Sequence, residues 1–301
     1  MADAIVTEGL TKRYGTTVAL DSLDLSIAPG EVFGYLGPNG AGKSTTIELL
    51  LGLIRPSAGS ARVLGLDVVA DAATLHRRLA FVPSVAELWP GLTGEETLRL
   101  LGNLHGSVDE DYRDLLVDRF ELDVGKKNRA YSHGNRQKVV LVAGFATRAD
   151  VLLLDEPTTG LDPLMEQVFR SCVAEARERG QTILLSSHIL SEVEATCDRV
   201  GMLRAGRLVD VGRLDSLRGL AAVRVHAHVP GDLPDLGAVP GLSHVAVSPD
   251  GAGGGTDLEC DVAGDIGPLV RVLADAGVER LTTREPSLEE LFIRRYGADG
   301  G

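Results

Sequence analysis

Features that mark several other protein classes are scarce or absent in this sequence. Its three cysteines are widely spaced and include no Cys-x-x-Cys pair, so we expect buried thiols in a reducing compartment rather than disulfides or a metal site. No apolar run approaches the ~20 residues that cross a bilayer. The first residues lack the apolar core of a signal peptide. These absences favour a cytoplasmic protein.

Aromatic residues and positive charge are also limited. Aromatic residues make up 4% of the chain, so the core must rest on aliphatic side chains. Lys and Arg total 30 against 43 Asp and Glu, which gives a formal net charge of -13. Because proteins bind nucleic acids largely through cationic side chains that meet phosphates, this balance argues against a nucleic-acid partner.

The 301 residues suggest about two domains. In the first two thirds of the chain, short apolar runs alternate with helix-length segments, which predicts an α/β fold with a largely parallel sheet. We expect strands at 32–36, 79–82, 151–154 and 182–186. We expect helices at about 43–52, 95–105, 109–120, 135–147, 163–179 and 189–196. The stretch 86–148 shows helical patterns only and is interpreted as a helical insertion.

The pattern changes near residue 218, so we expect a first domain over 1–218 and a small C-terminal α/β domain over 219–301. The second domain has three segments of period-two alternation, a hairpin loop at 248–255, a helix at about 266–276 and a strand near 278–283. Ser287 and Glu290 have the spacing of a capping box, which predicts a short amphipathic helix at the end of the chain.

A glycine-rich segment between a predicted strand and a predicted helix fits the phosphate-loop pattern GxxxxGK[ST]. This phosphate loop consists of Gly37, Pro38, Asn39, Gly40, Ala41, Gly42, Lys43 and Ser44. Its backbone N–H groups and the helix N-terminus are suited to a polyphosphate. We expect Lys43 to reach the β- and γ-phosphates, Ser44 to bind Mg²⁺ and Thr45 to contact an α- or β-phosphate. The loop alone does not distinguish one class of nucleoside triphosphatase from another.

An acidic pair follows the predicted strand at 151–154. Ligands of open α/β sheets bind at the carboxyl ends of strands, where Asp155 would hold Mg²⁺ through water or through Ser44. Glu156 is expected to point elsewhere and to polarise an attacking water. An isolated acidic pair would as readily be a strand-end cap or a surface salt bridge, but the phosphate loop upstream favours catalysis.

Three further segments narrow the class. They are Ser132-His133-Gly134-Asn135 at the start of a helical pattern, Gly160-Leu161-Asp162 after the acidic pair, and His188 just past another strand. With these motifs in this order, residues 5–215 resemble the ATP-binding cassette (ABC) ATPases of transporters. The resemblance implies a P-loop NTPase (RecA-like) core with a helical insertion subdomain and an N-terminal β subdomain.

The resemblance also implies a role for each motif. Residues 131–135 stand where the family has its signature segment, whose Ser132 and Gly134 would contact the γ-phosphate of ATP bound to a second ABC ATPase subunit, here expected to be another copy. Asp162 stands in the family's D-loop and His188 in place of its switch histidine. Tyr14 stands where the family stacks an aromatic ring on adenine; taken alone, it would be an ordinary half-buried strand tyrosine.

Two positions depart from the family's pattern. The signature segment reads Tyr-Ser-His-Gly-Asn rather than Leu-Ser-Gly-Gly-Gln. Ser84 replaces a glutamine that reaches Mg²⁺, and the shorter side chain would need a bridging water. Glu87 is either a substitute for that glutamine or a solvated loop acid. Trp89 lies where such ATPases contact a permease helix and is either such a contact or ordinary packing.

The lack of a membrane-spanning segment implies a separately encoded integral membrane permease, with the protein peripheral on the inner face of the cell membrane. The ending EPSLEELFIRRYG resembles the tails of bacterial ATPases that serve exporters, so we expect export of a drug, antibiotic or lipid-like compound. The alternatives are a soluble ABC ATPase acting on ribosomes or DNA, and a P-loop kinase or GTPase. The charge argues against the former, and the lack of an NKxD guanine reader against the latter.

Overall fold

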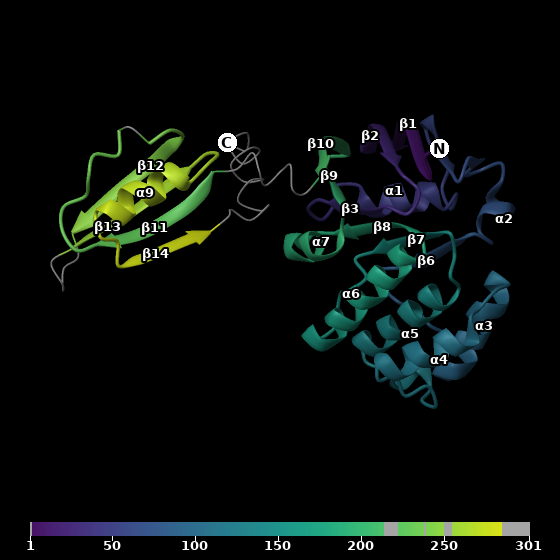
Figure 1. The fold of residues 1–301 in the computed structure, drawn as a ribbon. Helices are drawn as coiled ribbons and strands as arrows, with labels where there is room; N and C mark the ends of the chain where they lie inside the picture. The colour runs from purple at the N-terminus through teal and green to yellow at the C-terminus, as the bar shows by residue number, and fades with distance from the viewer. Residues whose placement is uncertain (1, 214–221, 238, 250–254, 285–301) are drawn as a thin grey trace. The chain divides into compact units, whose positions relative to one another are not determined.

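The computed structural model describes residues 2–213, 222–237, 239–249 and 255–284. The chain divides into two compact units, Met1–Gly212 and Arg213–Gly301 (Figure 1). The short C-terminal helix expected around Ser287 and Glu290 lies outside the described residues.

A small antiparallel sheet begins the first unit. It consists of β1 (Ile5–Tyr14), β2 (Thr17–Ile27), β4 (Ala58–Val63) and β5 (Leu66–Asp67), in the order β2-β1-β4-β5. Along β2 from Leu23 to Ile27, buried and exposed residues alternate, as expected for a sheet with one face against the core. This sheet provides the N-terminal β subdomain that the resemblance implies.

A six-stranded sheet forms the centre of the first unit, in the order β10-β9-β3-β8-β7-β6. Its strands are β3 (Val32–Leu36), β6 (Leu79–Val82), β7 (Val151–Asp155), β8 (Thr182–Ser187), β9 (Arg199–Arg204) and β10 (Arg207–Arg213). The strands from β9 to β6 pair in parallel. Every residue of β3, β7 and β8 is buried, which explains their continuous apolar runs. The α/β prediction is confirmed, and all four predicted strands are present.

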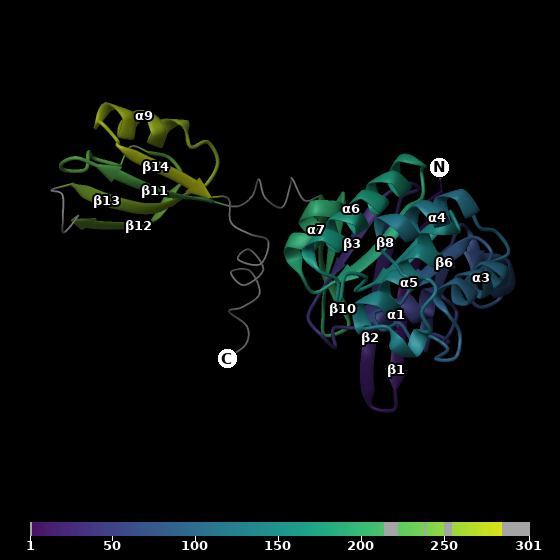
Figure 2. The same cartoon turned by 90° about the horizontal axis from the view of Figure 1, so that it is seen from below.

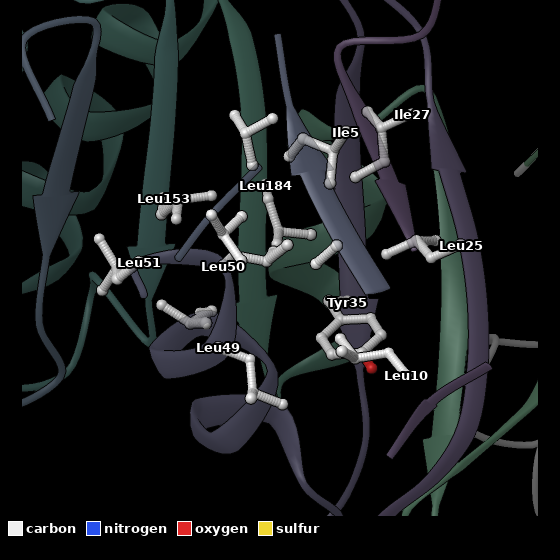
Figure 3. Packing of buried hydrophobic residues seen from close by; sticks show 14 of the residues in the cluster. Ile5, Leu10, Leu25, Ile27, Tyr35, Leu49, Leu50, Leu51, Leu153 and Leu184 are labelled. Atoms are coloured by element: carbon white, nitrogen blue, oxygen red, sulfur yellow. The ribbon is translucent and has the colours of Figure 1, made fainter. Parts of the chain in front are cut away.

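Helix α1 (Lys43–Leu50) packs between the two sheets, and Figure 1 shows it on the opposite side of the central sheet from α5 (His133–Ala146) and α6 (Pro163–Glu178). Figure 3 shows the aliphatic core that results, with Tyr35 the one aromatic ring labelled in it. Its labelled aliphatic members are Ile5, Leu10, Leu25, Ile27, Leu49, Leu50, Leu51, Leu153 and Leu184. Burial of each such side chain contributes about 1.5–3 kcal/mol, so this core holds α1 and the phosphate loop in place.

Residues 86–148, all of which the structure describes, contain helices and a single isolated bridge between Thr93 and Lys127. The helices are α3 (Gly94–His105), α4 (Glu110–Arg119), η1 (Asn128–Ala130) and α5. Helix α3 begins where it does because Thr93 and Glu96 form a reciprocal capping box, and it ends at Gly106 in the left-handed conformation. Two short helices, α2 (Ala72–Leu75) and α7 (Leu190–Thr196), complete the unit.

The second unit is a four-stranded antiparallel sheet with one helix. Its strands are β11 (Val223–Val229), β12 (Leu242–Pro249), β13 (Thr256–Val262) and β14 (Arg280–Arg284), in the order β12-β13-β11-β14. Helix α9 (Gly267–Asp275) covers one face of this sheet (Figure 2), where Leu269 and Leu273 join the core. Strands β12 and β13 pair as expected on either side of the predicted hairpin loop, of which 250–254 lie outside the described residues.

Among the residues that the structure describes, no helix has both the length and the apolar character needed to cross a membrane.

Candidate nucleotide site

The phosphate loop turns between the end of β3 and the start of α1. Gly42, the N-cap of α1, has φ 110°, and a Cβ added there would lie 2.6 Å from the carbonyl oxygen of Ala19. Only glycine therefore fits this position. The hydroxyl of Thr46 donates to the carbonyl of Gly42 at 3.0 Å, and the N–H of Gly37 donates to the carbonyl of Ser187 at 3.3 Å. These bonds fix the loop at the carboxyl end of the central sheet.

Lys43 is held inside this loop. Its side chain is only 5% exposed, and its ammonium donates to the carbonyls of Gly37 at 2.7 Å and Pro38 at 3.2 Å. A carboxylate oxygen of Glu156 lies 3.3 Å from the same nitrogen. Two carbonyls and one carboxylate therefore surround the ammonium inside the loop.

The remaining loop positions surround the N-terminus of α1. Pro38, Asn39 and Gly40 are exposed at the rim of the loop, whereas Ala41 is buried beneath it. Ser44 is exposed in the first turn of α1, and Thr45 beside it is partly exposed. A helix N-terminus with free N–H groups and accessible hydroxyls is suited to binding phosphate oxygens.

Glu156 leaves the strand in an unusual direction. Strand β7 ends at Asp155, and Glu156 has φ 45°, in the left-handed region that non-glycine residues seldom adopt. Its N–H donates to the carbonyl of Ser186 at 3.1 Å. This turn brings one carboxylate oxygen to Lys43 and places the other 3.1 Å from Nδ1 of His188, which is itself 44% exposed. The structure therefore joins Lys43 at the start of α1, Glu156 after β7 and His188 after β8.

Asp155 is buried at the end of β7, and one of its oxygens accepts a hydrogen bond from the hydroxyl of Ser186 at 2.5 Å. The Asp155 carboxylate and the Ser44 hydroxyl are oxygen ligands, which Mg²⁺ prefers. Protein sites usually give Mg²⁺ only one or two such ligands, and phosphate and water oxygens complete its coordination. The residues present fit that ion. No cluster of three or more His, Cys, Asp or Glu suited to a metal occurs among the described residues.

Ser132, Gly134 and Asp162 lie at helix starts. Ser132 is the N-cap of α5, where its hydroxyl accepts from the N–H of Asn135 at 3.2 Å, and Asp162 caps α6 in the same way. A Cβ added to Gly134 would lie 2.4 Å from the carbonyl oxygen of Gly160. The signature segment and the segment 160–162 therefore pack against each other, backbone to backbone.

Tyr14 and Ser84 lie on separate elements, one at the end of a strand and the other in a loop. Tyr14 is the last residue of β1 and is 49% exposed, with the ammonium of Lys12 4.9 Å from the centre of its ring. Its ring is thus available for stacking at one end of the small sheet. Ser84 is half-buried in the loop that follows β6.

Gln137 is a structural contributor that the sequence analysis missed. This fully buried side chain of α5 donates to the carbonyl of Pro83 at 3.0 Å and to that of Pro157 at 3.2 Å. It therefore ties the helix of the signature segment to the loop of Ser84 and to the turn that follows Glu156. The only sequence signal was a polar residue on a helix face that is otherwise apolar.

Comparison with known proteins places these features in context. A family model described as ABC transporter matches residues 20–159. The daunorubicin resistance ATP-binding protein DrrA3 of Streptomyces coeruleorubidus is 38% identical in an alignment 313 residues long. The alignment covers 99% of this chain and 98% of that protein. The Nod factor export ATP-binding protein I of Rhizobium etli is 32% identical, covering 98% of this chain and 94% of that protein.

A solved structure of the ATP-binding subunit of an ABC transporter superposes on the chain with a TM-score of 0.67 at 32% sequence identity. The match covers 71% of this chain and 92% of the other.

Proposed function

The chain belongs to the ABC transporter family as an ATP-binding subunit that hydrolyses ATP, and from that premise we propose that it powers export through a separately encoded membrane permease. The contact of Glu156 with both Lys43 and His188 carries the proposal, because it joins a phosphate-binding cation to a candidate base. Relatives named for drug resistance and Nod factor export match nearly the full chain, which supports export of a drug, antibiotic or lipid-like compound. An action on ribosomes or DNA finds no support in these names.

In the proposed reaction, the phosphate loop binds the β- and γ-phosphates, and Lys43 contacts their oxygens. A water oxygen attacks the γ-phosphorus while the bond to the bridging oxygen of ADP breaks. Glu156 accepts the proton that the water loses, and His188 orients the γ-phosphate and that water. Charge that develops on the transferred group is met by the Lys43 ammonium and by backbone N–H groups. Tyr14 stacks on the adenine.

Ser44 and Asp155 would hold Mg²⁺, with Ser84 reaching it through a water. When bound, the ion neutralises charge on the β- and γ-phosphate oxygens. The burial of Asp155 and its hydrogen bond from Ser186 keep this carboxylate oriented at the strand end.

We propose that a second copy completes each site. Ser132 is exposed at the start of α5, so its hydroxyl and the nearby N–H of Gly134 are accessible to ATP held by another chain. Asp162 lies beside them because Gly134 packs on Gly160. ATP bound between two chains would then draw the pair together, and its hydrolysis would release them.

The same proposal places the protein at the inner face of the cell membrane, held there by the permease. In the loop after β6, Val85 and Trp89 are 58% and 52% exposed. Exposed large apolar side chains close together in one loop are suited to protein contact. This exposure favours the interpretation of Trp89 as a permease contact over ordinary packing.

Replacing Glu156 with Gln tests the proposal. The amide keeps the size of the side chain but cannot accept the proton, so we expect ATPase turnover to fall by about 10²–10⁴-fold while ATP binding persists. ATP should then accumulate dimers, measured by light scattering after size-exclusion chromatography. Glu178→Gln, at an exposed position of α6, is the matched control and should retain turnover. Undiminished hydrolysis by Glu156→Gln would contradict the role of Glu156, and a monomer in ATP would contradict the second copy.

A further inference from the structure

A second carboxylate, that of Glu192, lies behind the Glu156–His188 contact. Glu192 is in the first turn of α7. One of its oxygens accepts from the hydroxyl of Thr158 at 2.7 Å, and the other accepts from the hydroxyl of Ser187 at 2.5 Å. Thr158 follows Glu156 after one intervening residue, and Ser187 directly precedes His188. A single side chain therefore links the two segments that carry the contact.

This link is well fixed. Thr158 and Ser187 are both buried, and burial raises the pKa of Glu192 even though the two hydroxyl hydrogen bonds oppose that shift. Hydrogen bonds to a carboxylate are stronger than neutral ones, and more so where water is excluded. The hydroxyl of Ser187 also accepts from the N–H of Ile189 at 2.9 Å, which fixes the chain on the far side of His188.

Glu156 and His188 need such support because both lie on loops beyond strand ends. Glu156 has the left-handed backbone described above, and nearly half of the His188 side chain is exposed. A displacement of about 1 Å at a reacting group is enough to reduce a rate by about 10²-fold. The geometry points to Glu192 as a positioning residue that holds Glu156 and His188 in register for ATP hydrolysis, an inference that rests on the roles given to those two residues in the proposed function.

The test compares steady-state ATPase kinetics of Glu192 variants in the full chain. Glu192→Ala removes both hydrogen bonds, so we expect kcat to fall by about 10–100-fold while KM for ATP changes by less than about twofold. Glu192→Gln should restore most of kcat, since its amide accepts from one hydroxyl and donates to the other. Ser191→Ala, at the exposed neighbouring position of α7, is the matched control and should keep the parent kcat.

Removing the hydroxyls one at a time gives a second measurement. Thr158→Val and Ser187→Ala each delete one of the two hydrogen bonds, so each should lower kcat by less than Glu192→Ala does. Adding Thr158→Val to Glu192→Ala should cost nothing further, because residues that act as one unit are not additive. If Glu192→Ala does not fold, Thr158→Val and Ser187→Ala still test the positioning role of Glu192.

The inference is overturned if Glu192→Ala folds and keeps the parent kcat, if only KM changes, or if Thr158→Val and Ser187→Ala both retain full turnover. The activity of Glu156→Gln shows whether the positioning role of Glu192 has failed or the proposed function itself. Loss of hydrolysis in Glu156→Gln alongside full activity in Glu192→Ala removes only the positioning role. Full activity in Glu156→Gln removes the proposed base itself.

Discussion

The central parallel sheet of the first unit and the antiparallel sheet of the second unit distribute their polar side chains in opposite ways. Strands β3, β7 and β8 are buried throughout, and the charged groups of the site, Lys43, Asp155 and Glu156, appear at or beyond strand ends. In the second unit α9 covers one face, and polar side chains cross the middle of the other. That face has a hollow of about 450 Å³ lined in part by His226, His228, Asp257, Glu259 and Arg280.

The difference shows how the covering of a sheet decides where chemistry is placed. A sheet covered on both faces accepts few polar groups along its strands, so ligands bind at its edge, where loops and helix N-termini meet. A sheet covered on one face presents polar groups side by side, and these satisfy one another. Nδ1 of His228, for example, lies 2.8 Å from a carboxylate oxygen of Asp257.

The largest expected effect concerns stability. Leu153 of β7 and Leu258 of β13 are both buried, but Leu153 lies in a strand covered on both faces. We expect Leu153→Ala to cost about 4 kcal/mol and Leu258→Ala about 2–3 kcal/mol of the free energy of unfolding, because a site enclosed on both faces of its sheet collapses less around a cavity. Urea denaturation followed by circular dichroism measures both. We expect each variant to shift a separate transition, and a single transition moved equally by both would break the comparison.

The next effect concerns catalysis. Asp155 and Asp257 are each held by a hydrogen-bonding neighbour, Ser186 and His228 respectively. Asp155→Asn removes a negative charge from the proposed Mg²⁺ site, so we expect hydrolysis to fall by about 10²-fold. Asp257→Asn should leave turnover within about twofold of the parent, as surface substitutions away from a site do. A strong loss of ATPase in Asp257→Asn would show that the open sheet face takes part in hydrolysis.

The smallest effect compares thiols. Burial raises the pKa of Cys172 to about 12 and that of Cys260, in the second unit, to about 11. The reactive form is the thiolate, so the lower pKa gives Cys260 more of it at any pH below both values. We therefore expect iodoacetamide at pH 8 to alkylate Cys260 faster than Cys172. Mass spectrometry of timed digests measures the two rates, and faster modification of Cys172 would reverse the comparison.

The sequence predicted the helices and strands that carry a clear local pattern, such as a continuous apolar run or a helix-start pair. Strands β7 and β8 read as strands because their apolar runs are continuous, and α6 begins at Asp162 and Pro163, which are typical of a helix start. Strand β9 was not predicted, since arginines at both ends and a central glycine interrupt its apolar residues. The phosphate loop was found because its chemistry lies within one short segment.

The rest of the site depends on contacts between segments far apart in the chain. Gln137 lies 54 residues from Pro83, and Glu192 lies 34 residues from Thr158. Neither pair has a local pattern, so both residues looked like ordinary polar positions on helices. The sequence predicted that Glu156 points away from Asp155, but not its left-handed backbone, which accompanies the hydrogen bond of its N–H to the carbonyl of Ser186 and is not typical of glutamate.

The close approach of Gly134 to Gly160 leaves no space for a side chain between them. Any displacement of the start of α5 must therefore be transmitted to the turn that leads into α6, and that turn follows Glu156 closely in the chain. A neighbouring subunit that pressed on Ser132 would be sensed within the site of the chain it touched, as well as in its own. In the proposed pair, contact at Ser132 would therefore be coupled to the segment that follows Glu156 through the approach of Gly134 to Gly160.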